Sequence, residues 1–531
     1  MFIFVFMSCA VFTGPAAPVA VQASGVEESP SIAIEVEQDQ LRSNELVILH
    51  TNDLHGHFLP ERAGWIDGEP TIGGFIAIDN YVSEIESRLG ESNVLLFDGG
   101  DILTGTPLTD MVVRGSQGGA MLQFMEAVGY DAWVLGNHEF DKGFDNIARL
   151  VADSNIPVLS SNVQGTDGDS PAMVGLRPSV VLSAGELKVG VIGATTMGLG
   201  HLASAETMSN IILADISDTV AEEISRLDEE TDLLVVLSHI GLESDQWLAE
   251  NVTGIDLIVG GHSHTHLDEP LNVNGTWIVQ AGSYGRSIGE LRVTVESDEI
   301  VSFTGVLNDL PAANAVDGSE TPPDTEVGRL TEQYRLAIES EYGQIVGEAS
   351  GGLFRSYHHE SSLGMWVTDV LRETMEADIG LYNGGGIRSD IVAGPLTPND
   401  VFNVFPFSNQ VVTFEVTGAE LMAMFVQNAH AAAFEDRGSI QMSGVNVVWN
   451  MRMGSPEIVS AIVGSEPLDP DQAYIIATNS YLHDQAARYM AGAQPVNLQP
   501  SGRTIFEVVL ARIRSGVISP PTDLRFVRQE D

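Results

Sequence analysis

Five apolar runs, each followed by side chains that can bind a metal ion, are the feature that most constrains the fold of this chain. They lie within the stretches "ELVILHTNDLHGH", "NVLLFDGGDILTG", "DAWVLGNHEFD", "DLLVVLSHIG" and "DLIVGGHSHTH". Near-continuous runs of Val, Ile and Leu are typical of strands buried on both faces. Ligand sites in α/β proteins form at the carboxyl ends of such strands. The runs therefore predict an α/β fold in which five loops converge on one site.

The residues that follow the five runs offer oxygen and nitrogen donor atoms and no thiolate. They are Asp53, His55, Asp101, Asn137, His138, His239, His262 and His264. Carboxylate, amide and imidazole ligands suit Zn, Mn, Fe, Co or Ni. Asp101 is the candidate bridge in a pair of ions about 3.5–4 Å apart. A single Asp or His in a loop is more often a cap or hydrogen-bond partner, but five strand ends in this order indicate a metal site.

The charge of the chain restricts its partners. Asp and Glu number 74 against 24 Lys and Arg, which gives a net charge of −50. A field of this sign repels nucleic acid polymers and anionic membranes, so a small molecule is the expected partner. An anionic substrate then needs a locally positive site, which metal ions would supply. One interpretation of this charge is a highly charged soluble protein from an acidic proteome, and the sharper hypothesis is adaptation to high external salt.

The N-terminal residues indicate export. A short apolar run gives way to small residues and the A-x-A-like site Val21-Gln22-Ala23, which resembles a secretory signal peptide. The single Cys, Cys9, lies inside this segment, so cleavage would leave a mature chain without Cys. A periplasmic or secreted protein is expected, rather than a lipoprotein acylated at "FMSC". No other apolar run approaches about 18 residues, so no membrane span is expected in the mature chain.

At 531 residues the chain is too long for one hydrophobic core, and two domains are expected. A Pro-, Gly- and acid-rich stretch near 307–326 is followed by "TEVGRLTEQYRLAIESEY", which has the apolar spacing of an amphipathic helix. The predicted segments are a signal peptide (1–23), a flexible leader (24–44), a first domain (45–317), a linker and helix (318–344) and a second domain (345–531).

The ordered motifs resemble those of the calcineurin-like metallophosphoesterases. "TNDLHGHF", "GGD", "GNHEFD" and "GGHSHT" are similar to motifs of the bacterial 5′-nucleotidase/UDP-sugar hydrolase family. The C-terminal stretches "YNGGGIRSDI" and "FPFSNQVVTFEVTG" are similar to the substrate-binding domain of that family. The resemblance implies an N-terminal metallophosphoesterase β-sandwich flanked by helices, and a smaller C-terminal α/β substrate-binding domain joined by a helical linker. It also implies a phosphomonoester hydrolase that uses metal-activated water to convert extracellular nucleotides to nucleoside and phosphate.

Mapped onto this sequence, the resemblance implies two divalent ions, with Zn, Mn or Co as candidates. One ion would take Asp53, His55, Asp101 and His264, and the other would take Asp101, Asn137, His239 and His262. His138 would lie over the phosphoryl group, oriented by Asp141, and Glu139 would have a structural role only. Because His138 directly follows Asn137, their side chains diverge, so one can reach an ion while the other faces the substrate.

The resemblance extends to substrate-binding residues in the second domain. It implies that Asn383, Gly385 and Arg388 bind phosphate and that Phe407 and Tyr481 stack on the nucleobase. A further phosphate ligand, Arg355, is displaced by two residues from its place in the family. The Gly-Gly-Asp stretch that follows the second aromatic in the family is also absent, since Gln485, Ala486 and Ala487 occupy it. The nucleotide preference is therefore open.

Three alternatives use the same core on other substrates: 2′,3′-cyclic nucleotides, UDP-sugars, or the sulfur ester of a thiosulfohydrolase-like relative. An alternative of another class is a non-catalytic nucleotide-binding surface protein. The complete ligand set disfavours it, because each buried His or Asp would otherwise need another partner. The sequence leaves the native metal and the oligomeric state open.

Overall fold

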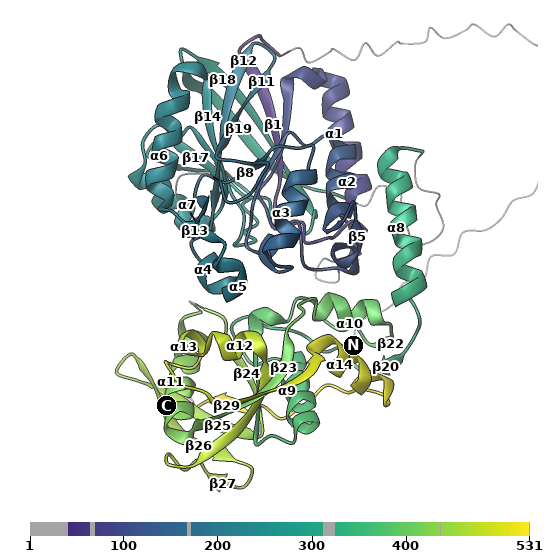
Figure 1. The fold of residues 1–531 in the computed structure, drawn as a ribbon, viewed down its shortest axis with the longest axis vertical. Coiled ribbons are helices and arrows are strands. Elements are labelled where there is room, and N and C mark those ends of the chain that lie inside the picture. The colour runs from purple at the N-terminus through teal and green to yellow at the C-terminus, as the bar shows by residue number, and fades with distance from the viewer. Residues whose placement is uncertain (1–40, 64–69, 167–170, 312–323, 436, 530–531) are drawn as a thin grey trace, which may run out of the picture. The chain divides into compact units, whose positions relative to one another are not determined.

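Two β-sheets form the centre of the N-terminal domain in the computed structural model (Figure 1). The first sheet has the strand order β10 (Leu176–Arg177), β8 (Val158–Leu159), β7 (Ala132–Val134), β4 (Val94–Asp98), β1 (Glu45–Thr51), β18 (Ser287–Glu296) and β19 (Glu299–Asp309). The second has the order β11 (Ser179–Ala184), β12 (Leu187–Thr195), β14 (Leu233–His239), β15 (Leu257–Val259), β17 (Thr276–Val279) and β16 (Leu271–Val273). The structure describes residues 41–63, 70–166, 171–311, 324–435 and 437–529, so the predicted signal peptide and most of the leader lie outside it.

The alternation of side chains along β1 explains why four consecutive residues, Leu46 to Leu49, are all apolar. Leu46 and Ile48 point into a core shared with strands of the second sheet. Val47 and Leu49 point the other way, into a core shared with α1 (Phe75–Leu89), α2 (Gly119–Val128) and α3 (Phe144–Asp153). Helices α6 (Ile216–Leu227) and α7 (Leu242–Asn251) cover the outer face of the second sheet through a third core. The first domain is therefore a β-sandwich flanked by helices.

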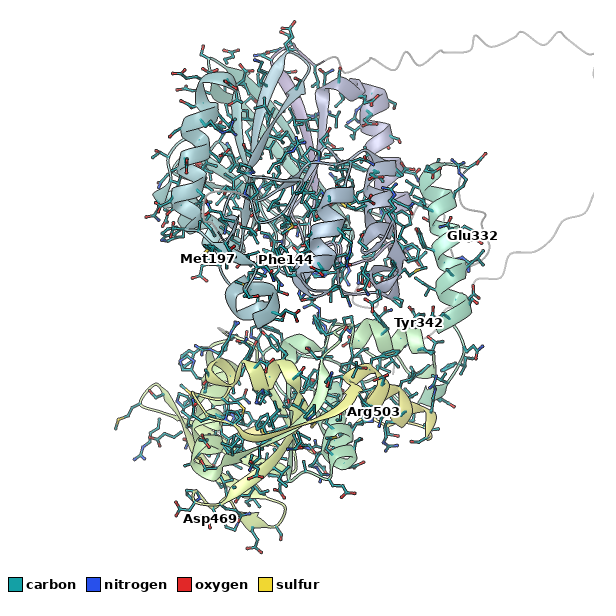
Figure 2. All side chains as sticks on the ribbon, viewed as in Figure 1. Phe144, Met197, Glu332, Tyr342, Asp469 and Arg503 are labelled. Carbon is teal, nitrogen blue, oxygen red and sulfur yellow. The ribbon has the colours of Figure 1, made fainter. Side chains whose placement is uncertain are left out.

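Helix α8 (Glu326–Tyr342) packs its apolar face on the first domain. Val327, Leu330, Tyr334 and Ile338 are buried in the same core as α1 and α2. Its other face carries charge and includes Glu332 (Figure 2). Arg335 pairs with Glu332 at 2.9 Å. The amphipathic spacing of the sequence is thus used to dock this helix.

The C-terminal domain contains two larger sheets and a two-stranded sheet of β20 (Gly347–Ala349) and β22 (Gly394–Leu396). One has the order β24 (Ile440–Ser443), β21 (Ile379–Asn383), β28 (Ala473–Asn479), β23 (Gln410–Thr417) and β29 (Val496–Thr504). The other has the order β27 (Glu466–Pro467), β26 (Ser455–Val463), β25 (Val445–Arg452) and β30 (Phe526–Arg528). The helices are α9 (Ser362–Met375), α10 (Pro398–Val404), α11 (Gly418–Phe434), α12 (Ser480–Asp484), α13 (Ala486–Tyr489) and α14 (Ile505–Arg514).

Local sequence determines where three of these helices begin. Thr397, Thr417 and Thr504 each accept a hydrogen bond from the backbone N–H three residues later, and an acidic residue at that later position accepts one in return. This reciprocal arrangement satisfies backbone donors that a helix N-terminus otherwise leaves unpaired. Among the helices of the described residues, none combines the length and the apolar character needed to cross a bilayer.

Candidate metal centre

The carboxyl ends of five strands bring the predicted ligands together. β1 and β4 run parallel, as do β4 and β7 in the first sheet and β14 and β15 in the second. Their last residues lead into loops whose side chains form three groups, each with ligand atoms within 4.8 Å of one another. The groups are Asp53, His55 and His264; His55, Asp101 and His138; and Asp101, His239 and His262.

Asp101 lies between the two halves of this cluster. Its Oδ2 is 3.1 Å from His239 Nε2 and 3.8 Å from His55 Nε2. On the other side, Asp53 Oδ1 is 3.2 Å from His264 Nε2 and 3.8 Å from His55 Nε2. The Asp101 carboxylate is therefore within reach of ligands on both sides, as a bridging ligand must be.

Backbone carbonyls fix the orientation of two of the imidazoles. His55 Nδ1 donates to the carbonyl oxygens of Leu103 and Thr104, at 2.9 and 2.7 Å, and His239 Nδ1 donates to that of Gly99 at 2.6 Å. With the proton on Nδ1, the Nε2 lone pair of each ring faces the cluster. A hydrogen bond from the distal nitrogen commonly orients metal-binding histidines in this way.

Unsatisfied atoms show that these residues fit a divalent cation. Asp53 Oδ1, Asn137 Oδ1 and His239 Nε2 are buried side-chain atoms without a hydrogen-bond partner. The Nε2 atoms of His55 and His264 also face each other at 3.1 Å. A buried polar atom without a partner costs about 1–3 kcal/mol. Metal cations bound within this cluster would satisfy these lone pairs.

The backbone of the ligand loops is in an uncommon conformation. Five candidate ligands have positive φ angles between 48° and 75°: Asp53, His55, Asp101, His262 and His264. Side chains other than Gly rarely adopt this region, and such strain is concentrated at functional sites. Gly136 permits the packing, because a Cβ there would lie 2.1 Å from Asp101 Oδ1.

His138 and Asp141 form a hydrogen-bonded pair at the edge of the cluster. His138 Nδ1 is 2.7 Å from Asp141 Oδ2, and Thr104 Oγ1 donates to the same oxygen at 2.8 Å. His138 Nε2 is 4.0 Å from Asp101 Oδ2. Burial opposes the charged imidazolium, but the carboxylates of Asp141 and Asp101 outweigh it and raise the pKa of His138 above its ordinary value. The pair can hold a proton next to the cluster.

Glu139 organises the ligand loop without facing the site. Its buried carboxylate accepts hydrogen bonds from the backbone N–H groups of Asp101, Ile102, Leu103 and Gly136, at 2.7–3.2 Å. These four hydrogen bonds are the physical basis for the structural role predicted for Glu139.

The sequence reasoning did not identify several supporting residues. Asn52 Nδ2 donates to Asp53 Oδ2 at 2.7 Å, and the ring of Tyr284 contacts those of His55 and His264. Asn52 could have been suspected from the sequence because it is next to a predicted ligand. Nothing in the sequence around Tyr284 or Thr104 indicates their roles, because those roles depend on how the loops fold back.

Two residues of the C-terminal domain reach the cluster. Arg388 Nη2 is 3.3 Å from His55 Nε2, and its guanidinium lies 5.8 Å from the centre of the Phe407 ring. The Phe407 ring is in turn 5.6 Å from that of His138. Asn383 is buried at the end of β21, accepts a hydrogen bond from Asn479 Nδ2 at 2.9 Å, and leads into the turn that holds Gly385.

The other two predicted substrate residues make contacts within the C-terminal domain. Tyr481 packs on Tyr489 at a ring distance of 6.0 Å. The Arg355 side chain donates to the carbonyl oxygen of Ile387 at 3.4 Å, next to Arg388. Their roles stay predictions.

Comparison with known families agrees with this arrangement. Residues 46–266 match the calcineurin-like phosphoesterase family, and residues 345–493 match the 5′-nucleotidase C-terminal domain. The chain belongs to the 5′-nucleotidase family of calcineurin-like phosphoesterases. This phosphoesterase is a metal-dependent phosphoester hydrolase of the 5′-nucleotidase type, and the predicted two-domain α/β fold is confirmed.

Individual relatives align over most of the phosphoesterase. It is 27% identical to the 5′-nucleotidase of Diplobatis ommata, over 89% of this chain and 90% of the relative. It is also 27% identical to the human 5′-nucleotidase, over 86% of this chain and 87% of the relative. The crystal structure of a 5′-nucleotidase precursor from Thermus thermophilus superposes with a TM-score of 0.80 at 25% identity, covering 92% of this chain and all of that one.

Proposed function

We propose that this phosphoesterase binds two divalent ions and hydrolyses nucleoside 5′-monophosphates to nucleoside and phosphate. The observation that carries the proposal is the convergence of Arg388 and Phe407 on the metal-ligand cluster. An arginine suits phosphate because its planar fork bonds two oxygens. An aromatic ring beside it offers a stacking surface for a nucleobase.

Under this proposal, Asp53, His55, Asp101 and His264 hold one ion, and Asp101, Asn137, His239 and His262 hold the other. The three unsatisfied atoms belong to this set, with Asp53 Oδ1 on one side of Asp101 and Asn137 Oδ1 and His239 Nε2 on the other. Zn, Mn or Co fits the mixed nitrogen and oxygen donors.

When bound, the ions would lower the pKa of a water molecule and neutralise charge on the phosphate oxygens. The protein supplies the rest. Arg388, together with Asn383 and Gly385, orients the phosphate. His138, with Nδ1–H donated to Asp141, presents a proton on Nε2 to the phosphoryl or leaving oxygen as charge develops there.

We also propose that the chain acts outside the cytoplasm, in the periplasm or the medium, after removal of residues 1–23. We further propose a first domain at 45–317, a linker and helix at 318–344, and a second domain at 345–531. Two observations support these boundaries: the hydrophobic cores of the two halves are separate clusters, and α8 packs on the first half.

A substrate panel tests the function. Purified enzyme supplied with Mn, Zn or Co is assayed for phosphate release from AMP, ATP and a UDP-sugar and for opening of 2′,3′-cyclic AMP. AMP turnover faster than that of the other three supports the proposal. Faster turnover of one of the others, or none of any, would overturn it.

A further inference from the structure

Gln280 directly follows β17 and is not among the proposed metal ligands. Only 1% of its surface is exposed, although glutamine side chains usually lie at the protein surface. A buried side-chain amide needs hydrogen-bond partners. The partners of Gln280 lie in residues 261–265, the loop that carries His262 and His264.

Three hydrogen bonds join this loop to the Gln280 amide. Nε2 donates to the carbonyl oxygen of Gly261 at 2.9 Å. Oε1 accepts from Ser263 Oγ at 2.9 Å and from the backbone N–H of Thr265. The three contacts fall before, between and after the two histidines, so the loop is folded around one side chain.

These partners also determine which end of the amide faces which residue. A backbone carbonyl can only accept a hydrogen bond and a backbone N–H can only donate one, so the amide nitrogen must face Gly261 and the oxygen must face Thr265. A glutamate at position 280 would lack the donor, and an apolar side chain would lack both groups. The loop therefore depends on the amide itself and not only on its volume.

The loop needs this support because its backbone is strained. His262 and His264 have φ angles of 75° and 54°, in the left-handed region that side chains other than Gly rarely adopt. Backbone conformations of this kind persist only where the surrounding structure holds them. Gln280 bonds to the residues that flank each histidine, so it is placed to hold both of them.

Further hydrogen bonds connect the loop to strand ends that carry other ligands. Ser263 Oγ accepts from the backbone N–H of Leu242 at 3.1 Å, three residues after His239. Ala281, the residue after the buried glutamine, donates its N–H to Asn52 Oδ1 at 2.7 Å. Ligands on both sides of the cluster are therefore positioned through one connected set of hydrogen bonds.

We propose that Gln280 is a positioning residue, whose amide fixes His262 and His264 relative to each other. The inference rests on the proposed function, in which His264 holds one ion and His262 holds the other. Because one side chain supports ligands of both ions, it helps to determine how far apart the ions lie. Loss of this support should therefore weaken binding at both sites rather than at one.

Zinc titration of the metal-free, full-length protein tests this role. Gln280→Met keeps the length of the side chain but removes its donor and its acceptor, so zinc affinity should fall by about 10–100-fold at both sites. With cobalt bound in place of zinc, the visible absorption spectrum should also change, because it depends on the geometry of the ligands around the ion. Ser263→Ala removes one of the three hydrogen bonds, at an exposed residue, and should lower zinc affinity less.

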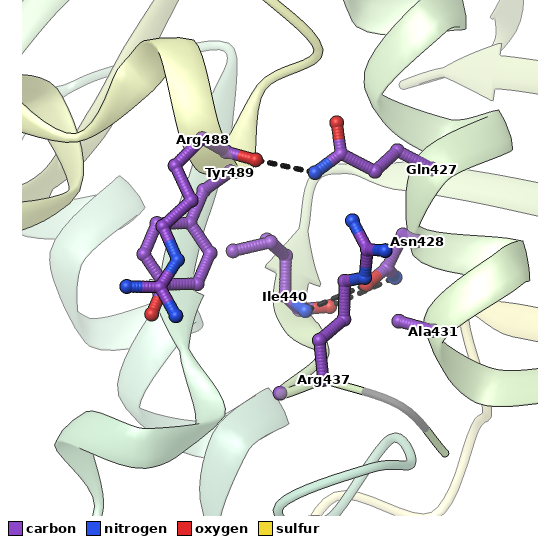
Figure 3. Close-up of a pocket in the computed structure, with 8 residues that line it drawn as sticks. Gln427, Asn428, Ala431, Arg437, Ile440, Arg488 and Tyr489 are labelled. Carbon is purple, nitrogen blue, oxygen red and sulfur yellow. Dashed lines mark hydrogen bonds between the residues drawn. The ribbon is translucent and has the colours of Figure 1, made fainter. Parts of the chain in front are cut away.

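Asn428→Leu is the matched control. Asn428 is buried in the C-terminal domain and also bonds to the backbone with both ends of its amide. Its Nδ2 donates to the carbonyl oxygen of Ile440 at 3.1 Å, and its Oδ1 accepts from the N–H of Ile440 at 2.6 Å (Figure 3). Gln280→Met and Asn428→Leu should both make the metal-free protein unfold at lower denaturant concentration, but only Gln280→Met should weaken zinc binding.

Wild-type zinc affinity at both sites of folded Gln280→Met, or an equal loss of affinity in Asn428→Leu, would overturn the positioning role. If Gln280→Met does not fold, unchanged affinity in Ser263→Ala would overturn it. These results leave the proposed function intact as long as the wild-type protein binds two ions. Wild-type protein that binds fewer than two ions would instead overturn the two-ion site on which the inference rests.

Discussion

At the scale of single residues, Asp101 Oδ2 and His138 Nε2 lie 4.0 Å apart, but we assign metal binding to Asp101 and proton donation to His138. Asp101→Ala removes the carboxylate shared by the two halves of the cluster, so bound metal and activity should be lost together. His138→Ala removes no proposed ligand, so metal content should persist while turnover falls by about 10²–10⁴-fold. Metal analysis by mass spectrometry and phosphate release from AMP measure both effects. Full activity in metal-replete His138→Ala would refute its assignment.

Glu139 is expected to matter for stability although it binds no ion. Glu139→Ala leaves four buried backbone N–H groups without their acceptor, so the free energy of unfolding should fall by about 3 kcal/mol or more. Glu139→Gln, which keeps an acceptor oxygen, should lie between wild type and the alanine variant. Denaturant unfolding of the metal-loaded proteins measures the order, and an alanine variant as stable as wild type would contradict it.

At this scale the sequence predicted a metal site and its ligands, but not the residues that hold those ligands in place. Donor atoms after five apolar runs identify metal-competent residues, because the chemistry belongs to the side chains themselves. The hydrogen bond from Thr104 to Asp141, or the contact of Tyr284 with His55, depends on loops that turn back in three dimensions. Nothing in the neighbouring sequence marks those residues.

At the scale of elements, the glycines after the strands determine how closely the loops pack. A Cβ on Gly136 would lie 2.1 Å from Asp101 Oδ1 and 2.6 Å from its backbone nitrogen, so Gly136→Ala should displace the bridging carboxylate. Metal affinity should fall by about tenfold or more, the scale of losses at residues that support metal ligands. Titration of the metal-free protein with Zn or Mn measures this.

Gly200→Ala is the matched control for that titration. A Cβ there would have its nearest neighbour 3.8 Å away, on Leu213, so affinity should be unchanged. Wild-type affinity in Gly136→Ala, or an equal loss in both variants, would contradict the assignment.

The long elements were predictable from sequence and the short ones were not. β1, β4 and β14 each contain a continuous apolar run because both of their faces are buried, and that run is visible in the sequence. Two-residue strands such as β8 and β10 carry too few side chains for a periodic signal. The strand order, which places β18 between β1 and β19, depends on pairing between residues distant in sequence.

At the scale of the whole molecule, the net charge of −50 is expected to make salt stabilising. Repulsion among like charges opposes the compact state, and at 1 M salt the screening length is about 3 Å. Activity and melting temperature should therefore rise as NaCl increases from low concentration toward molar levels. Loss of activity in molar NaCl would count against adaptation to high salt.

The central claim is that this fold assembles a two-ion site that cleaves phosphate from nucleotides. The most direct measurement combines metal content with turnover on one preparation: ions per chain by mass spectrometry, and phosphate released from AMP before and after chelation and after metal is restored. We predict two divalent ions per chain, loss of turnover on chelation and recovery with Mn, Zn or Co. Undiminished turnover by metal-free protein, or no phosphate release by protein that holds both ions, would contradict the account.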